Sequence, residues 1–531
     1  MGAMRSWSLS LLLLLLSGGV MSRALPSPAA AGGGADSISL DGSWEFEADP
    51  DDVGVAERWF STAARPKLER AIKSPGAWQA QGVGNETALE THQYEGVGWY
   101  RKVVDLSLAE NSGLRAVASN GGTSAYLWIG GAPGGVMRSA NVFANGVHCG
   151  RHVGYLEPLE IELTQALRGA AAGDADKLVI AVAVDSRWNR TEDPLWGGGS
   201  MWNSGGPGSG GGAGAHVPTV PASAGDGYSF GGYGGMIGHA KVLVRQRAWL
   251  EDSVHVACKD ILSSSSGDWQ CSVKFALVGR FSAADRVSLT VCESSGAGGC
   301  TRWGAPIFRE VEVGVSSSSS GSTSPRMAIT VTIWDAKLWV PGTKAAQTSL
   351  YFANLTLHGG GNDGLSAQKS TRFGVRSLST DGNRIRMNGE PLFLRGYGDD
   401  GQYAFTGAPP MDRQYYMAQL TGMKMLGYNF IRFHTHSMPD VFHEVADELG
   451  FLCDPEFAMN YAYPCPFPGC VVTDQVQQTF NRSFASIVQR TSHHPSLFGY
   501  VLSNEIGFGA SEPGLLQFVE LCESTTAPFS R

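Results

Sequence analysis

The sequence has no basic block, and it is poor in charge of either sign. Asp, Glu, Lys and Arg make up 17% of the 531 residues, and the formal net charge is −9. Nucleic-acid-binding proteins carry a basic patch or stripe, so nucleic acid is not the expected partner. No cysteine spacing is typical of a zinc site, and beyond the N-terminus no segment is apolar for long enough to cross a bilayer. A neutral or mildly polar ligand fits this composition better.

Residues 1–24 predict a secretory signal peptide. Arg5 precedes an apolar stretch from Trp7 to Leu16, and small residues follow as far as Val20. The stretch is too short to span a bilayer comfortably, so no stable membrane anchor is expected; a short N-terminal anchor is the alternative. Cleavage after Ala24 and cleavage within residues 29–31 fit equally. Four sequons support a glycoprotein that is secreted or lies in the endomembrane lumen: Asn85, Asn189, Asn354 and Asn481.

Nine cysteines suit an oxidising compartment. Because the total is odd, at least one thiol is free or has its partner outside this chain. We interpret the cysteines as structural or buried and not as metal ligands. The pairs closest in sequence are Cys258/Cys271, Cys292/Cys300 and Cys465/Cys470, which leaves Cys149, Cys453 and Cys522.

The length and the turn spacing predict several domains, because 531 residues exceed what one core usually holds. Short β-rich runs separated by turn residues predict a β-sandwich over residues 37–245. Within it, residues 197–214 are rich in glycine and nearly free of charge, and we expect a mobile loop there. Strands at similar spacing predict a second, smaller β-sandwich over residues 246–376.

After Gly389 the pattern changes to alternating strands and helices. Regular βα units with short loops predict a parallel sheet with right-handed crossovers. A closed (β/α)8 barrel needs eight strands and roughly 250 residues, so residues 377–531 are expected to form only the first half of one. Strands are expected at 392–397, 428–433, 451–454 and 498–502, and helices at 412–426, 439–449 and 474–491.

Residues 498–505 form an apolar run that ends in an amide and a carboxylate, Asn504 and Glu505. The run follows His494 and Pro495 without alternation, which predicts a strand buried on both faces. An unpaired carboxylate in an apolar setting is costly, so Glu505 is expected either to meet a cation or to be a proton donor with a raised pKa. A helix N-cap with an acidic first turn is the alternative.

A series of motifs lies in one order along the chain, at residues 40–46, 75–78, 97–102, 145–158, 334–340, 350–351, 373–376, 386–396, 427–436 and 493–505. Together these motifs, over residues 37–510, resemble glycoside hydrolase family 2, the family of β-galactosidases, β-glucuronidases and β-mannosidases. The resemblance implies three domains: a jelly-roll-like sugar-binding β-sandwich, an immunoglobulin-like β-sandwich and a TIM barrel.

The resemblance implies roles at the positions that fit these motifs. Residues 493–505 are similar to the segment that ends in the general acid/base glutamate of the family. Glu505 is therefore expected to protonate the leaving glycosidic oxygen, and Asn504 to contact a sugar hydroxyl. Residues 427–436 resemble the second barrel strand, after which the family places a substrate-contacting histidine. His434 and His436 both fit, and we favour His436. Barrel active sites lie at the C-terminal ends of strands, which suits this placement.

The chain departs from the pattern of the family at two strand ends. Where many members have an asparagine and a histidine after the first strand, this chain has Gly396 to Asp400, which leaves Asp399 and Asp400 as candidate substrate-binding residues. Glu456, after the third strand, is expected to act in substrate binding. No metal is expected, because Ala458 stands where a histidine ligand of magnesium would be; magnesium held by oxygen ligands alone is the alternative.

The catalytic nucleophile is a further departure. A retaining mechanism needs two carboxyl groups about 5–5.5 Å apart, one of which is the nucleophile. In the family this residue lies on the seventh strand, which has no counterpart here. The resemblance therefore implies a C-terminally truncated chain that is inactive alone. Glu456 as a substitute nucleophile is the less favoured alternative, because opposite approach to the two faces of a sugar is difficult from adjacent strands.

We therefore expect a secreted, exo-acting glycoside hydrolase that cleaves terminal β-glycosides with retention, without a cofactor. Two other interpretations stay open. One is a secreted, non-catalytic carbohydrate-binding protein with a decayed barrel, and the other is a surface adhesion or structural β-sandwich protein. The expected partner is a carbohydrate or glycoconjugate. The sequence does not fix the sugar, the linkage or the oligomeric state.

Overall fold

The computed structural model describes most of the chain between Ser37 and Leu502. The described residues are 37–61, 68–86, 92–119, 122–131, 134–154, 156–169, 176–187, 233–261, 267–282, 284–294, 307–312, 326–342, 348–360, 364–401, 403, 405–434, 436–457, 474–502, 520 and 522–524. The predicted signal peptide, the glycine-rich loop and Asn189 lie outside them. Among these residues, no helix is both long and apolar enough to cross a membrane.

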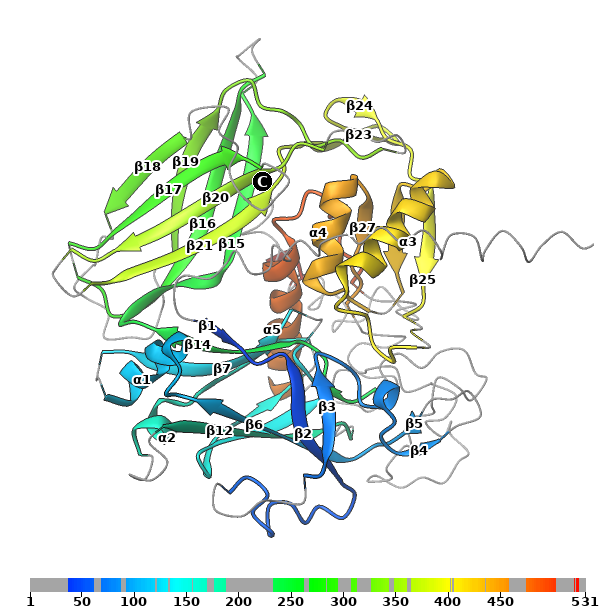
Figure 1. Cartoon of the computed structure of the whole chain (residues 1–531). Helices are drawn as coiled ribbons and strands as arrows, with labels where there is room; N and C mark the ends of the chain where they lie inside the picture. The colour runs from blue at the N-terminus through cyan, green and yellow to red at the C-terminus, as the bar shows by residue number, and fades with distance from the viewer. Residues whose placement is uncertain are drawn as a thin grey trace, which may run out of the picture.

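The N-terminal β region, residues 37–245, contains two main antiparallel sheets (Figure 1). Their strand orders are β1-β14-β7-β11 and β10-β9-β12-β6-β2-β3. Side chains alternate between the two faces of a strand, so Trp44 and Phe46 of β2 both enter the core, where they pack with Trp78 and Tyr100. This alternation places one large apolar core in the region.

Among the described residues, the N-terminal β region consists mainly of strands, with the two α-helices α1 and α2 between them. The elements are β1 (Ser37–Ser39), β2 (Gly42–Asp49), β3 (Arg70–Ser74), η2 (Gln79–Gln81), β4 (Asn85–Glu86), β5 (His92–Gln93), β6 (Val97–Asp105), η3 (Ala109–Asn111), α1 (Ser112–Ser119), β7 (Ser124–Gly130), β8 (Val136–Met137), β9 (Ser139–Ala144), β10 (Val147–Val153), β11 (Leu159–Glu162), α2 (Thr164–Arg168), β12 (Lys177–Asp185), β13 (Gly235–Met236) and β14 (His239–Arg245).

The middle β region, residues 248–376, also has two antiparallel sheets, with the orders β15-β16-β19 and β18-β17-β20-β21. Its own core includes Trp269, Phe275, Leu355 and Phe373. The strands are β15 (Ala248–Asp260), β16 (Trp269–Gly279), β17 (Arg286–Glu293), β18 (Ile307–Glu312), β19 (Arg326–Ile333), β20 (Tyr351–His358) and β21 (Ser366–Phe373).

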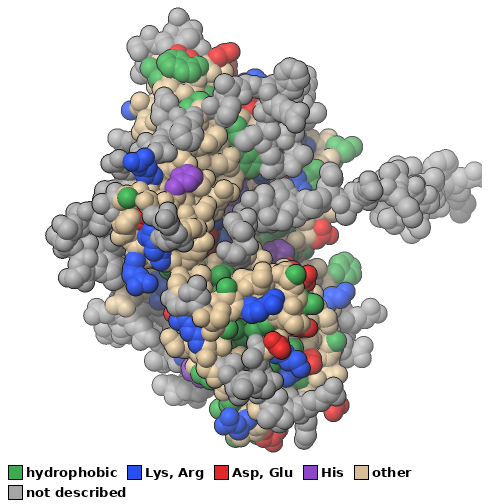
Figure 2. All heavy atoms as spheres, turned by 60° about the vertical axis from the view of Figure 1, so that its left-hand side comes forward, with side chains coloured by type: hydrophobic (Ala, Val, Ile, Leu, Met, Phe, Trp, Pro, Cys, Tyr) green, Lys and Arg blue, Asp and Glu red, His purple; other side chains and the backbone are tan. Residues whose placement is uncertain are grey.

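In the upper part of Figure 2, most of the described surface is tan, the colour of backbone and of side chains that are neither charged nor hydrophobic, and charged side chains are scattered across it. On β20 the core residues Ala353 and Leu355 flank Asn354, which therefore lies on the opposite face of the sheet. There the Ser370 hydroxyl donates to Asn354 Oδ1 at 2.6 Å.

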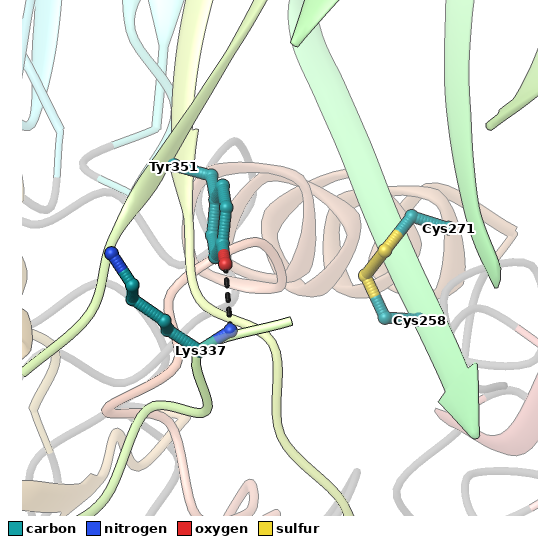
Figure 3. Close-up of a disulfide and its surroundings, with 4 residues drawn as sticks. All are labelled: Cys258, Cys271, Lys337 and Tyr351. Carbon is teal, nitrogen blue, oxygen red and sulfur yellow. Dashed lines mark hydrogen bonds between the residues drawn. A yellow bond between two sulfur atoms is a disulfide. The ribbon is translucent and has the colours of Figure 1, made fainter. Parts of the chain in front are cut away.

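A disulfide joins β15 to β16 (Figure 3). Cys258 and Cys271 face each other in the register of the two strands and form the bond, which confirms the first of the close cysteine pairs. Cys292 is also disulfide-bonded, and Cys149 and Cys453 are not. Near the first disulfide, the Lys337 backbone N–H donates to the Tyr351 hydroxyl at 2.9 Å. Three other cysteines lie outside the described residues: Cys300, Cys465 and Cys470.

The remaining chain forms a parallel sheet flanked by helices, which we call the parallel region (residues 396–501). A small antiparallel sheet of β22 (Leu378–Asp381), β23 (Arg384–Met387) and β24 (Glu390–Pro391) precedes it. The parallel strands, in the order β25-β26-β27, are β25 (Gly396–Asp399), β26 (Phe430–Phe433) and β27 (Leu452–Asp454). The helices are α3 (Arg413–Met425), α4 (Asp440–Leu449) and α5 (Asp474–Thr491).

The helix predictions in this region agree with the structure to within a residue at each described end. Asp412 caps α3, with its carboxylate accepting from the Gln414 N–H at 2.8 Å, and α4 ends at Gly450, whose φ of 65° suits glycine. The prediction of a strand buried on both faces at 498–502 was wrong. The segment pairs with β27 and the residues after it only through isolated parallel bridges, Cys453 to Leu497 and Glu456 to Val501, and residues 498–502 are half-buried. Among the described residues no strand covers its other edge.

Candidate active site

Four neighbouring segments of the parallel region run in the same direction, so their C-terminal ends meet at one edge. The register places Asp399 of β25 beside Phe433 of β26, and Arg432 of β26 beside Asp454 of β27. The fourth segment continues this order, since Val501 bridges to Glu456. Strand ends of this kind are where parallel α/β folds place binding and catalytic side chains.

Asp399 and His436 meet where β25 and β26 end. His436 Nε2 lies 3.6 Å from Asp399 Oδ1, and the same oxygen accepts from the Gly401 N–H at 2.8 Å. His436 Nδ1 lies 2.9 Å from the His434 carbonyl oxygen, so we assign the Nδ1–H tautomer. Burial, partly offset by Asp399, lowers the pKa of His436 and favours the neutral ring. With Nδ1–H engaged by the His434 carbonyl, His436 Nε2 and the Asp399 carboxylate are both hydrogen-bond acceptors at the edge of the sheet.

His434 and Asp400 form a second pair beside the first. His434 Nδ1 lies 3.5 Å from Asp400 Oδ1. The Asp400 side chain is 56% exposed, whereas those of Asp399 and His436 are 15% and 13% exposed. Asp400 therefore lies nearest to solvent, and the structure brings together all four residues that the sequence analysis placed after the first two strands.

Glu456 has a different environment from the one predicted for a sugar-binding residue. Its side chain is fully buried, and Arg432 Nη2 donates to its Oε2 at 2.8 Å. Its backbone is held as well, since the Glu456 N–H donates to the His436 carbonyl at 3.2 Å and the Ser437 hydroxyl donates to the Glu456 carbonyl at 3.1 Å. In this arrangement Glu456 orients Arg432, whose side chain is 41% exposed. Direct substrate binding by Glu456 stays a prediction.

Asp454 belongs to the same edge, and the sequence analysis did not single it out. It ends β27 next to Arg432, and burial raises the pKa of its carboxyl group to about 6. A carboxyl group that titrates near neutrality beside other ionisable groups is a marker of functional sites. The available signal in the sequence was its position, two residues before Glu456 on an extended segment, where side chains share one face.

Asn504 and Glu505 lie outside the described residues, but the segment that leads to them is described. The Phe498 N–H donates to the Cys453 carbonyl at 2.8 Å, and the Val501 N–H donates to the Pro455 carbonyl at 3.1 Å. These bonds set the register of the segment against β27 and direct it toward the edge where Glu456 lies.

No group of three or more His, Cys, Asp or Glu residues within the described ranges is arranged to hold a metal ion. The carboxylate of Glu456 is engaged by the guanidinium of Arg432. Ala458, at the position where the family resemblance would place a histidine ligand, lies outside the described residues. The prediction that the protein has no resident metal is therefore left to experiment.

No protein-family model matches the chain. Individual known proteins nevertheless match nearly its whole length. A β-galactosidase of Leuconostoc mesenteroides subsp. mesenteroides is 21% identical over 503 residues, which cover 91% of this chain and 41% of that protein. The chain thus spans less than half the length of this relative.

Among solved structures, β-glucuronidase from Ruminococcus gnavus superposes with a TM-score of 0.66 at 15% identity, over 93% of this chain and 71% of that chain. The same enzyme in complex with D-glucuronic acid gives a TM-score of 0.65 at 15% identity. The chain therefore shares its fold with this β-glucuronidase.

Proposed function

We propose that the protein is a secreted glycoside hydrolase that cleaves terminal β-glycosides with retention of configuration. The observation that carries this proposal is the meeting of Asp399, His436 and Glu456 at one edge of a parallel sheet, toward which the segment before Glu505 also runs. The similarity to a β-galactosidase and the fold shared with a β-glucuronidase support it.

In this proposal Glu505 acts twice. Its carboxylic acid protonates the glycosidic oxygen as the bond from that oxygen to the anomeric carbon breaks and a second carboxylate bonds to the anomeric carbon. The Glu505 carboxylate then takes a proton from water, whose oxygen attacks the anomeric carbon and displaces the second carboxylate. Asn504 contacts a sugar hydroxyl beside the reacting carbon.

The described residues at the edge would bind and orient the sugar. His436 and Asp399 together offer a neutral imidazole and a carboxylate at low exposure, which suits hydrogen bonds to vicinal hydroxyl groups. His434 and Asp400 place a second imidazole and a second carboxyl group beside the first pair, nearer to solvent. Glu456 contributes by holding Arg432, and its burial weighs against its acting as the nucleophile, because a nucleophile must reach the anomeric carbon.

The domain assignment belongs to the same proposal. We assign residues 37–245 to a jelly-roll-like sugar-binding sandwich, 246–376 to an immunoglobulin-like sandwich and 377–531 to the first half of a TIM barrel. The pairs of antiparallel sheets and the three parallel strands with their helices support it. Residues 1–24 would direct secretion, and the sequons would carry glycans.

The residue that forms the glycosyl-enzyme is not assigned within residues 1–531. We therefore propose that the polypeptide of residues 1–531, produced alone, does not turn over aryl β-galactosides, β-glucuronides or β-mannosides. Turnover by that polypeptide, abolished by Glu456→Gln, would favour Glu456 as the nucleophile instead.

The test uses the natural protein that contains this chain, purified from its source and incubated with a panel of aryl β-glycosides. Proton NMR of the first-formed sugar should show the β-anomer, as retention requires. The α-anomer would exclude the retaining mechanism. Saturable sugar binding without hydrolysis of any substrate would favour the alternative, a non-catalytic carbohydrate-binding protein. Activity that survives EDTA would support the absence of a resident metal.

A further inference from the structure

A buried carboxylate outside the edge described above holds the start of the segment that leads to Glu505. We infer that Asp447 is a positioning residue for Glu505, and that the middle β region sets its position through Arg372, Trp339 and Arg376. The inference rests on the proposed role of Glu505. The inference adds that the middle β region, which contributes no reacting group, helps to determine the position of Glu505.

Both oxygens of Asp447 bind the residues on either side of Pro495. Asp447 lies on α4 and its side chain is fully buried. His494 Nδ1 lies 2.6 Å from Asp447 Oδ2, and the Ser496 N–H donates to Oδ1 at 3.0 Å. Burial lowers the pKa of His494 to about 3, so its ring is neutral and donates from Nδ1 to the carboxylate. One side chain on α4 thus fixes the backbone where the fourth segment begins.

The middle β region holds the same two elements from the other side. Arg372 Nη2 lies 3.7 Å from Asp447 Oδ2, and Trp339 Nε1 donates to the Asp447 carbonyl at 2.8 Å. The guanidinium of Arg376 donates to the Leu497 carbonyl. Two arginines and a tryptophan from this region therefore bind both the anchoring residue and the segment that it anchors.

Close packing leaves little freedom at this contact. A Cβ atom at Gly374 would lie 2.7 Å from both Cβ and Cγ of Pro495, and 2.9 Å from Cβ of Trp339. Because these neighbours belong to buried residues, a side chain at Gly374 would displace the segment or the middle β region. Glycine at this position is thus explained by the approach of Pro495.

Hydrogen bonds to β27 and to the residues after it link the start of the segment to its end. The Cys453 N–H donates to the Ser496 carbonyl at 2.9 Å, and the Phe457 N–H donates to the Val501 carbonyl at 2.9 Å. Val501 precedes Glu505 by four residues. Misplacement of a catalytic group by about 1 Å costs on the order of 100-fold in rate, so loosening of this anchor is expected to impair acid catalysis.

The first test measures hydrogen exchange in the 531-residue chain, which needs no catalytic activity. In Asp447→Asn, the amides of Cys453, Phe457, Phe498 and Val501 should exchange at least tenfold faster than in the parent chain. The matched control is Asp440→Asn, on the same helix, whose side chain pairs with Arg490 of α5 at 2.7 Å. It should leave these four amides unchanged. Equal exchange in Asp447→Asn and the parent chain would overturn the inference.

Gly374→Ala is the second variant, in case Asp447→Asn does not fold. It lies in the middle β region and leaves the Asp447 side chain in place. It should accelerate exchange at Phe498 and Val501 while β15 and β16 keep the protection of the parent chain. Unchanged exchange at Phe498 and Val501 in a folded Gly374→Ala chain would contradict control by the middle β region.

The last readout separates positioning from general destabilisation. In the natural protein, Asp447→Asn should slow glycosides with poor leaving groups at least tenfold more than activated aryl glycosides, mainly through kcat. Equal slowing of all substrates would mean that Asp447 only supports folding, and would overturn its role toward Glu505. If the slowing caused by Glu505→Gln does not depend on the leaving group, the proposed function fails. The hydrogen-exchange rates alone then decide whether Asp447 anchors the segment.

Discussion

Replacement of Arg432 by methionine tests whether the buried carboxylate at the candidate site depends on its guanidinium. Arg432 Nη2 donates to Glu456 Oε2 at 2.8 Å, and the Glu456 side chain is fully buried. Methionine keeps much of the apolar stem and removes the charge. Glu456 would then be left as a buried carboxylate without the cation that now compensates its desolvation.

The size of the effect follows from the exposure of the two partners. Removal of one partner of a fully buried pair costs about 3–5 kcal/mol. The Arg432 side chain is 41% exposed, so water already screens part of the interaction, and we expect about 2 kcal/mol. For a folding unit of the size of the parallel region, a loss of about 2 kcal/mol lowers Tm by about 8–16 °C.

Differential scanning calorimetry of the 531-residue chain measures this shift, once the transition of the parallel region has been identified by its response to Phe442→Ala in the core of that region. The double variant Arg432→Met/Glu456→Gln should recover at least half of the loss, because a neutral amide needs no cation. The control is Arg386→Met, which breaks a pair with Asp381, a residue whose side chain is 65% exposed, and should change stability by less than about 0.5 kcal/mol. An Arg432→Met shift no larger than that of the control would refute the reasoning.

Three further predictions concern single features of the structure. Burial raises the pKa of Asp454 to about 6, so as the pH rises the unfolded chain loses this proton before the folded chain does. The free energy of unfolding should therefore fall as the pH rises from about 4 through 6. In calorimetric scans at stepped pH, Asp454→Asn should make this fall smaller. Cys258 and Cys271 are 13 residues apart, and replacing both by alanine should destabilise the middle β region by about 3 kcal/mol. Urea unfolding followed by tryptophan fluorescence should then have a lower midpoint, and an unchanged midpoint would contradict this prediction. At Gly401, φ is +69° and a Cβ would lie 3.1 Å from His436 Nδ1. Gly401→Ala should therefore lower Tm, because alanine is strained at this φ, and should raise KM for the natural protein by displacing His436. An unchanged KM would contradict a binding role for His436.

Local sequence signals predicted the helices of the parallel region because each signal acts within a few residues. Asp412 caps the helix that it precedes, and Gly450 supplies the left-handed conformation that ends α4. The order of the four segments also followed from the βα rhythm. Asp399 and His436 were singled out through the family resemblance, and the structure places them at one edge. These parts of the fold and site needed no knowledge of distant contacts.

The parts that sequence reasoning missed depend on residues far apart in the chain. The pairing of Arg432 with Glu456 and the binding of His494 by Asp447 join different elements, and no periodicity encodes them. The apolar run at 498–502 was expected to be fully buried because hydrophobicity indicates a strand without saying what covers it. Asp454 was overlooked because a carboxylate at a strand end usually belongs to a turn, and its spacing from Glu456 is a weak signal until its burial is known.

The central claim is that Glu505 is the general acid/base of a β-glycosidase. It is tested most directly by Glu505→Gln in the natural protein, with rates for aryl glycosides of graded leaving-group ability, with and without azide. Glutamine keeps the shape but cannot exchange a proton, so poor leaving groups should be slowed most, and azide should accelerate turnover of activated substrates by replacing the water that needs a general base. Equal slowing of every substrate, with no effect of azide, would contradict the assignment and leave Glu505 as a capping or binding residue.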